Sequence, residues 1–205
     1  MAALDEGLQA LFSFLGPAGA LAALFLLFVI DAAIFPALPE LAIVVTYLYG
    51  APEFEPLPRA LLLLSMALAG ELAGNTLLYL WVRRLLVDRG RLPGWVERGM
   101  ARWTQFLLVP DERIILVNRI APVVPFVGAF MAVLRWSYRK SAAYILIGAA
   151  TKYALLLLLV GSLGVAFRRD VATTITVGAV LILVIVSLTS ATLVRRRASP
   201  PAKGG

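Results

Sequence analysis

The residues of this sequence that could do chemistry are charged side chains inside long apolar stretches. Arg119 lies in such a stretch, and Pro122 and Pro125 follow it closely. Each proline removes a backbone donor and breaks a helix, and an arginine in hydrocarbon is costly unless it finds a partner or water. Broken backbone at membrane depth survives only where it is packed in protein or lines a cavity. We therefore predict a re-entrant hairpin over 113–134, with Arg119 near its tip beside a polar cavity.

A second segment of the same kind carries the opposite charge. Residues 31–50 are apolar around Pro36 and Pro39, with Asp31 at the mouth and Glu40 just after the break. We predict a second re-entrant hairpin here. The alternative is that Asp31 and Glu40 simply lie at a helix end and at an interface.

Two polar residues share one face of a predicted spanning helix. Glu71 and Asn75 are one turn apart, and Gly70 and Gly74 form a G-x-x-x-G stripe that lets another helix approach closely. This face points at protein or a cavity. A packing role for the glycines, with Asn75 bonding between helices, would explain everything except Glu71. The stripe fits a homodimer and a hairpin equally well.

Lys152 falls near the middle of another predicted span, too deep to reach the surface easily. An ammonium inside the membrane is a functional-site hypothesis by default. Glu40 or Glu71 is its expected partner.

The composition bounds the class of protein. Of the 205 residues, 61% are apolar and 15% are charged, and the mean hydropathy is +0.90, whereas soluble domains have about 25% charged residues. We predict an all-α integral membrane protein. The absence of cysteine and histidine removes the usual nucleophiles, general bases and metal ligands, so we expect no enzyme, cofactor or metal. The net charge of +7 is typical of basic cytoplasmic loops and not of nucleic-acid binding.

The predicted elements form a single transmembrane domain over 1–197, followed by a disordered tail over 198–205. Gly16 and Pro17 either kink the first span or separate a short interfacial segment from it. An amphipathic helix is predicted at the interface over about 93–108. The four predicted spans are about 8–30, 60–82, 141–165 and 171–194.

The distribution of basic residues predicts the orientation in the cell membrane. With two hairpins that enter from opposite sides, most basic residues fall on one side, which the positive-inside rule makes cytoplasmic. Both termini are then cytoplasmic. The first hairpin enters from outside and the second from inside. Making one hairpin a full span would put basic clusters on opposite sides.

Four motifs in order resemble the DedA family, whose shared region is also called the VTT or SNARE-associated Golgi protein domain. They cover roughly 28–164: the acid after proline in PALPE, the spacing of the signature G-x-x-x-G-D-x-x-x-Y-x-x-G-R, the R-F-x-P motif, and two closing glycines. The matching residues are Pro36–Glu40, Gly70, Gly74, Tyr79, Arg83, Arg119, Pro122, Gly161 and Gly164, with Asn75 at the position of the signature Asp.

The chain departs from the family pattern at several positions. Asn75 stands where the family has Asp, Val82 where it has Gly, and Pro125 where a second functional Arg is usual. Lys152 falls near a position often held by Trp. The resemblance leaves room for Glu71 and Lys152 to replace the missing Asp and Arg.

The resemblance implies an inverted-repeat fold and movement of lipids across the membrane. Bacterial members are associated with recycling of undecaprenyl phosphate and with the proton motive force, and eukaryotic relatives scramble phospholipids. We expect Arg119, helped by Lys152, to bind an anionic lipid phosphate, since guanidinium grips phosphate in a bidentate way.

The acids complete this expected site. Glu40 and Glu71 would neutralise the cations between substrates, and either could take up a proton. The alternatives are a small cation or drug exporter with these carboxylates as ligands, and a non-transporting membrane scaffold.

Overall fold

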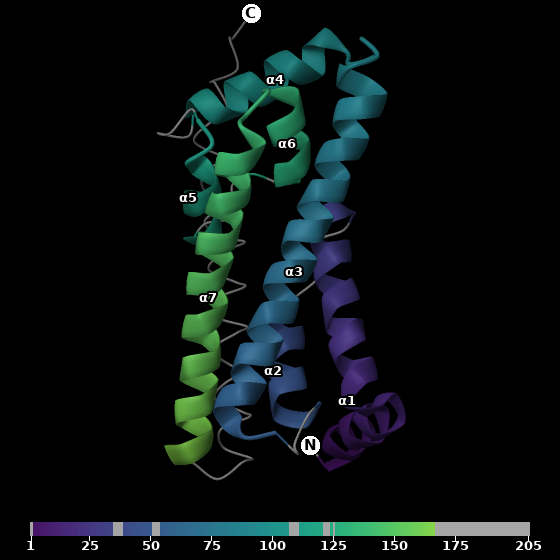
Figure 1. Ribbon diagram of the computed structural model, residues 1–205, viewed down its shortest axis with the longest axis vertical. Coiled ribbons are helices and arrows are strands. Elements are labelled where there is room, and N and C mark those ends of the chain that lie inside the picture. The colour runs from purple at the N-terminus through teal and green to yellow at the C-terminus, as the bar shows by residue number, and fades with distance from the viewer. Residues whose placement is uncertain are drawn as a thin grey trace, which may run out of the picture.

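The computed structural model describes residues 2–34, 39–50, 54–106, 111–120, 124 and 126–166 (Figure 1). This part of the chain is all-helical, without a strand, which confirms the predicted all-α class. Three helical stretches are long and apolar enough to cross a membrane: Ala10–Ala33, Pro56–Val87 and Tyr138–Ser162. They support a multi-pass membrane protein. The predicted fourth span, 171–194, and the tail over 198–205 lie outside the described residues.

Helix α1 (Ala2–Ala33) is broken at Gly16, whose φ of 64° lies in the left-handed region. Glycine adopts this backbone without steric cost, and Pro17 then starts a new helical stretch. The N-terminal part lies across the lower end of the bundle, and residues 17–33 rise from it (Figure 1). The predicted break at Gly16 and Pro17 is confirmed.

Helix α2 (Pro39–Tyr49) runs back toward the start of α1. Proline suits the first turn, where its missing N–H has no helical partner. The rings of Phe12 and Tyr49 stack with centroids 6.5 Å apart. The chain therefore enters and leaves this helix pair, residues 17–49, at the same lower end.

The bounds of this pair differ from the predicted hairpin over 31–50. Asp31 belongs to the last turn of α1, because Ala32 and Ala33 favour helix and the next proline after Pro17 is Pro36. Residues 12 and 49 also lie at one end of the bundle, whereas the predicted span over 8–30 would have separated them.

Helix α3 (Pro56–Val82) runs the length of the bundle and continues in a π-helical turn, η1 (Arg83–Val87). The glycine stripe packs on α1. A Cβ at Gly70 would lie 2.7 Å from the Phe25 carbonyl oxygen, and one at Gly74 would lie 2.5 Å from that of Val29. The stripe is therefore used within the chain, by α1.

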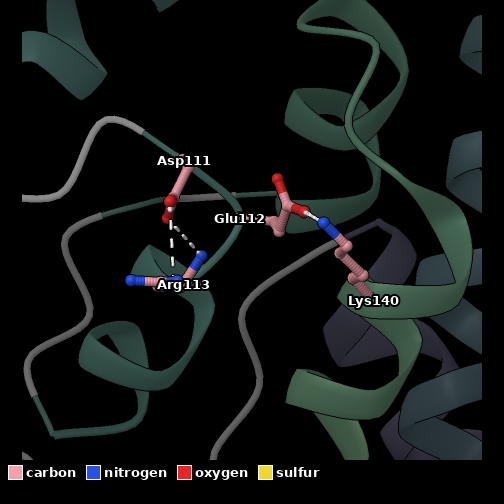
Figure 2. A network of polar contacts seen from close by, with 4 residues as sticks. All are labelled: Asp111, Glu112, Arg113 and Lys140. Carbon is pink, nitrogen blue, oxygen red and sulfur yellow. Dashed lines mark hydrogen bonds and ion pairs between the residues drawn. The ribbon is translucent and has the colours of Figure 1, made fainter.

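Helix α4 (Gly94–Phe106) lies across the upper end, close to the predicted 93–108 (Figure 1). The short helix α5 (Ile114–Ile120) follows. Just before α5, the Asp111 side chain accepts a hydrogen bond of 2.9 Å from the Arg113 backbone N–H (Figure 2).

Helix α5 starts at the upper end. Glu112, just before it, forms an ion pair of 3.5 Å with Lys140 at the start of α7 (Tyr138–Ala166) (Figure 2). Helix α6 (Val127–Val133) starts beside the middle of α3 and ends near η1. The chain thus enters and leaves the α5–α6 pair at the upper end.

Two apolar clusters hold the bundle together, one in each half. The lower cluster joins α1 and α2 to α3 and to the C-terminal half of α7, and the upper one joins α5 and α6 to the end of α3 and the start of α7. Large apolar side chains also face outward on the three long helices, as expected of surfaces that contact lipid; they include Leu26, Leu77, Trp81, Leu155 and Leu158.

Candidate functional site

Two of the charged residues predicted for the site, Glu71 and Lys152, lie near the middle of long helices. Glu71 and Leu72 are the central residues of the 32-residue span Pro56–Val87. Lys152 lies two positions from the centre of Tyr138–Ser162. Both would therefore lie near the midplane of a bilayer.

Lys152 and Glu40 form an ion pair between α7 and α2. The Lys152 ammonium donates a hydrogen bond to Oε1 of Glu40. Their side chains are 31% and 17% exposed, and Lys152 Nζ also lies 5.3 Å from the centroid of the Tyr153 ring. Of the two carboxylates predicted as partners of Lys152, the structure selects Glu40.

Local sequence explains how the pair is positioned. Pro39 starts α2, so Glu40 falls in its first turn, where the helix dipole favours an acid. At the C-terminal end of α2, Arg59 donates a hydrogen bond of 3.2 Å to the Tyr47 carbonyl. A basic group in this position stabilises a helix C-terminus. Both ends of α2 are thus tied to other helices by charged side chains.

Phe28 of α1 contacts both α3 and α7, which shows which residues of these two helices lie at the same height in the bundle. Its ring meets the Tyr153 ring edge-on with centroids 5.1 Å apart, and a Cβ at Gly70 would lie 2.7 Å from its own Cβ. Glu71 follows Gly70 and Lys152 precedes Tyr153, so both charged residues lie at the same level of the bundle.

Asn75 joins α3 to α6. Its Nδ2 donates to the Glu71 carbonyl at 3.0 Å, and its Oδ1 accepts from the Gly128 N–H at 3.2 Å. Glu71 and Asn75 are only 5% and 4% exposed. A Cβ at Gly128 would lie 2.3 Å from the Asn75 carbonyl oxygen. The sequence suggested two roles for Asn75, hydrogen bonding between helices and substrate binding. The structure shows the first of these.

Asn118 makes a contact beyond the end of α5 that sequence reasoning missed. Its Oδ1 accepts a 2.7 Å hydrogen bond from the Val124 N–H, which ties the end of α5 to a residue just before α6. An amide inside the apolar run Ile114–Ile120, next to Arg119, was the signal that could have revealed it.

The other predicted residues are placed as follows. Asp31 is partly buried in the last turn of α1. Arg119 belongs to the last turn of α5 by its backbone, while its side chain and the whole of Pro122 lie outside the described part of the structure.

A cavity of about 160 Å³ lies elsewhere, at the upper end, and none of the predicted site residues lines it. Its lining consists of Val87, Gly90, Leu92, Glu97, Val133 and Arg135. Within the described residues, no cluster of three or more acidic side chains could hold a metal.

Known proteins give no guide to this site. No family model matches the chain, and no match was found among curated proteins or solved structures. The resemblance to the DedA family therefore depends on the motifs in the sequence.

Proposed function

We propose that this protein moves a lipid across the membrane by passing its anionic phosphate headgroup over the Lys152–Glu40 pair. The observation that carries the proposal is this partly exposed ion pair, which joins Lys152, near the centre of a helix long enough to span a bilayer, to Glu40 in the first turn of the short helix α2. An ammonium in hydrocarbon needs a partner, and a carboxylate that a phosphate can displace gives it one between substrates.

The architecture supports this function. Each half of the chain has a helix across one end, then a helix pair that enters and leaves at that end, then a long helix. We propose that the pairs 17–49 and 111–133 are re-entrant hairpins from opposite leaflets, and that the two halves form an inverted repeat. Such repeats place a binding site at the midplane, where modest rocking exposes it to either side.

The proposed mechanism exchanges partners at Lys152. The phosphate of a polyprenyl-phosphate carrier or a phospholipid replaces Glu40 on the ammonium, and Arg119 adds a bidentate grip. We propose that this exchange of partners is coupled to the proton gradient across the membrane. The lipid tail stays in the bilayer. A cation exporter fits less well, because Glu40 is already neutralised by Lys152.

We also propose that the upper end faces the cytoplasm of a cell. Its loops and helices carry most of the basic residues, as the positive-inside rule requires; examples are Arg84, Arg89, Arg91, Arg98, Arg113, Arg135, Arg139 and Lys140. The N-terminal part of α1 lies at the other end, since Phe12 stacks on Tyr49. This orientation replaces the cytoplasmic N-terminus expected from the sequence.

The test measures headgroup movement in proteoliposomes. Lys152→Gln, Glu40→Gln and Arg119→Ala should each slow the initial rate about tenfold or more, because a charge-assisted hydrogen bond contributes about 1.5–3 kcal/mol. Lys140→Gln is the matched control. It breaks the ion pair between Glu112 and Lys140, whose side chain is 68% exposed. Wild-type rates in all three site variants would rule out the proposal.

A scaffold would respond differently. The double variant Lys152→Gln with Glu40→Gln keeps two polar side chains of similar size, so a purely structural pair should be replaced without loss of function. Under the transport proposal the double variant folds but no longer moves lipid.

A further inference from the structure

We propose a second headgroup-binding site, at the upper end of the face between α3 and α7, that receives the anionic phosphate of a membrane lipid on its way to Lys152. It consists of Thr76, Tyr79, Arg83 and Tyr138, which we call the tyrosine seam. The proposal rests on the lipid-transport function above and names a second place where its substrate binds.

Arg83 supplies the charge of the tyrosine seam. Its Nη1 donates a hydrogen bond to the Tyr79 hydroxyl, and its Cζ lies 5.6 Å from the centroid of the Tyr79 ring. The side chain is 54% exposed, and its Nε lies 3.9 Å from a carboxylate oxygen of Asp88. A guanidinium has five N–H donors, so these contacts leave others for a phosphate oxygen.

A line of hydroxyls continues from Arg83 into the membrane. The rings of Tyr79 and Tyr138 lie with centroids 5.3 Å apart, and the Tyr138 hydroxyl is 2.9 Å from Oγ1 of Thr76. Positions 76, 79 and 83 share one face of α3. At about 1.5 Å per residue, Thr76 lies about 10 Å deeper than Arg83. The hydroxyls thus lead from the membrane surface toward the level of the charged residues.

Part of the seam lies on the outer surface of the helices: Arg83 and Tyr138 are exposed, whereas Tyr79 is only 5% exposed. The Thr76–Tyr138 hydrogen bond is exposed, and the neighbouring Leu77 and Trp81 are more than half exposed, at 56% and 58%. A lipid tail could lie against these side chains while the phosphate follows the hydroxyls. Polar groups at such a surface are costly unless they are bonded, which favours a site whose hydroxyls pair with each other until a substrate arrives.

The backbone at Arg83 is also unusual. Arg83 begins the π-helical turn, and its carbonyl accepts a 2.8 Å hydrogen bond from the Asp88 N–H. Such turns are rare among helices as a whole, and those that occur are frequently found at functional sites. The simpler role for Tyr79 and Tyr138 is that of interfacial aromatic anchors. That role requires the rings and neither the hydroxyls, nor Thr76, nor Arg83.

The test removes single hydroxyls while keeping the rings. The probe is fluorescent NBD-phosphatidic acid in phosphatidylcholine vesicles containing the full chain, followed by dithionite quenching. We expect Tyr79→Phe, Tyr138→Phe and Arg83→Gln each to lower the initial rate about five- to tenfold. Thr76→Val, which keeps the side-chain shape at a partly buried position, serves as a second variant should an aromatic one fold poorly.

The controls make the same changes outside the tyrosine seam. Tyr144→Phe removes a hydroxyl six residues along α7, and Arg84→Gln removes the neighbouring charge, so both should keep the wild-type rate. Wild-type rates in the Thr76, Tyr79 and Tyr138 variants would overturn the seam and leave the transport proposal standing. A wild-type protein that moves no lipid would instead reject the transport proposal itself. Inhibition of the wild-type protein by millimolar inorganic phosphate, lost in Arg83→Gln, would show a site for free phosphate and overturn the lipid assignment.

Discussion

At the scale of single residues, Asn75 is explained by the bonds that an amide can make and a carboxylate cannot. Its Nδ2 donates to the Glu71 carbonyl while its Oδ1 accepts from Gly128. An ionised Asp would keep the second bond, but it would turn an oxygen toward the Glu71 carbonyl and place a charge beside a buried acid. An asparagine at position 75 is therefore consistent with the local structure.

The first prediction concerns this side chain. Asn75→Asp should lower the thermal stability of detergent-solubilised protein at neutral pH, and stability should return at acidic pH. The protonated carboxyl can donate the bond that Nδ2 makes, whereas the ionised one cannot. A melting temperature that is the same at both pH values would contradict this account of Asn75. Asn118→Asp is the comparison, since Asn118 uses only its acceptor oxygen toward Val124 and should not show the acid rescue.

The second prediction concerns Gly128. Gly128→Ala should destabilise the protein by about 1–3 kcal/mol, the usual cost of overpacking, because the new methyl would lie 2.3 Å from the Asn75 carbonyl oxygen and 3.1 Å from the Tyr79 nitrogen. Gly99→Ala in α4 is the control, since a Cβ there meets nothing within 4 Å. Unfolding followed by intrinsic fluorescence measures both. Equal stability of the two variants would mean that α6 does not approach α3 this closely.

At the scale of elements, the contact between α1 and α3 depends on two glycines. Both face α1 backbone carbonyls at distances that no Cβ tolerates. The stripe is thus covered within one chain, and we expect it to serve folding.

The third prediction follows from that cover. Gly74→Ala should cost about 1–3 kcal/mol of stability without changing the oligomeric state, measured by thermal unfolding and by light scattering in detergent. Ala69→Leu adds more volume to an exposed position of the same helix and should leave stability unchanged. A dimer that dissociates in Gly74→Ala while the monomer stays folded would assign the stripe to self-association.

The sequence predicts these elements to different degrees. The long helices, the break at Gly16, the helix across the upper end and the need of Lys152 for an acidic partner follow from local patterns. The choice of Glu40 over Glu71 does not, because it depends on how α2 meets α7. The predicted first span ends too early, at residue 30, since Asp31 reads as a membrane boundary although α1 continues to Ala33. Asn118 was missed because a single amide that bonds beyond the end of its helix has no periodic signal.

At the scale of the whole molecule, the two helix pairs enter the bundle from opposite ends. In the part of the chain that the structure describes, most basic residues lie at the upper end and few charged ones at the lower end. The N-terminal part of α1 lies across the lower end and α4 across the upper end.

The fourth prediction tests this arrangement by cysteine labelling, for which the cysteine-free chain is ready as it stands. Single cysteines at Phe14 and Phe54, which are 87% and 41% exposed at the lower end, should react with an impermeant maleimide from one side of the membrane. A cysteine at Trp95, 71% exposed on α4, should react only from the other side. Labelling of positions 14 and 54 from opposite sides would restore a full first span over 8–30.

One contact described above limits how this molecule can move. At adjacent positions of α3, Gly74 touches the backbone of α1 and Asn75 touches the backbone of α6, so helices from both halves meet at one level. Sliding either helix pair along α3 would break one of these backbone contacts, while tilting about that level would keep both. We therefore expect the helix pairs to move by tilting about this level of α3, so that opening at one end accompanies closing at the other.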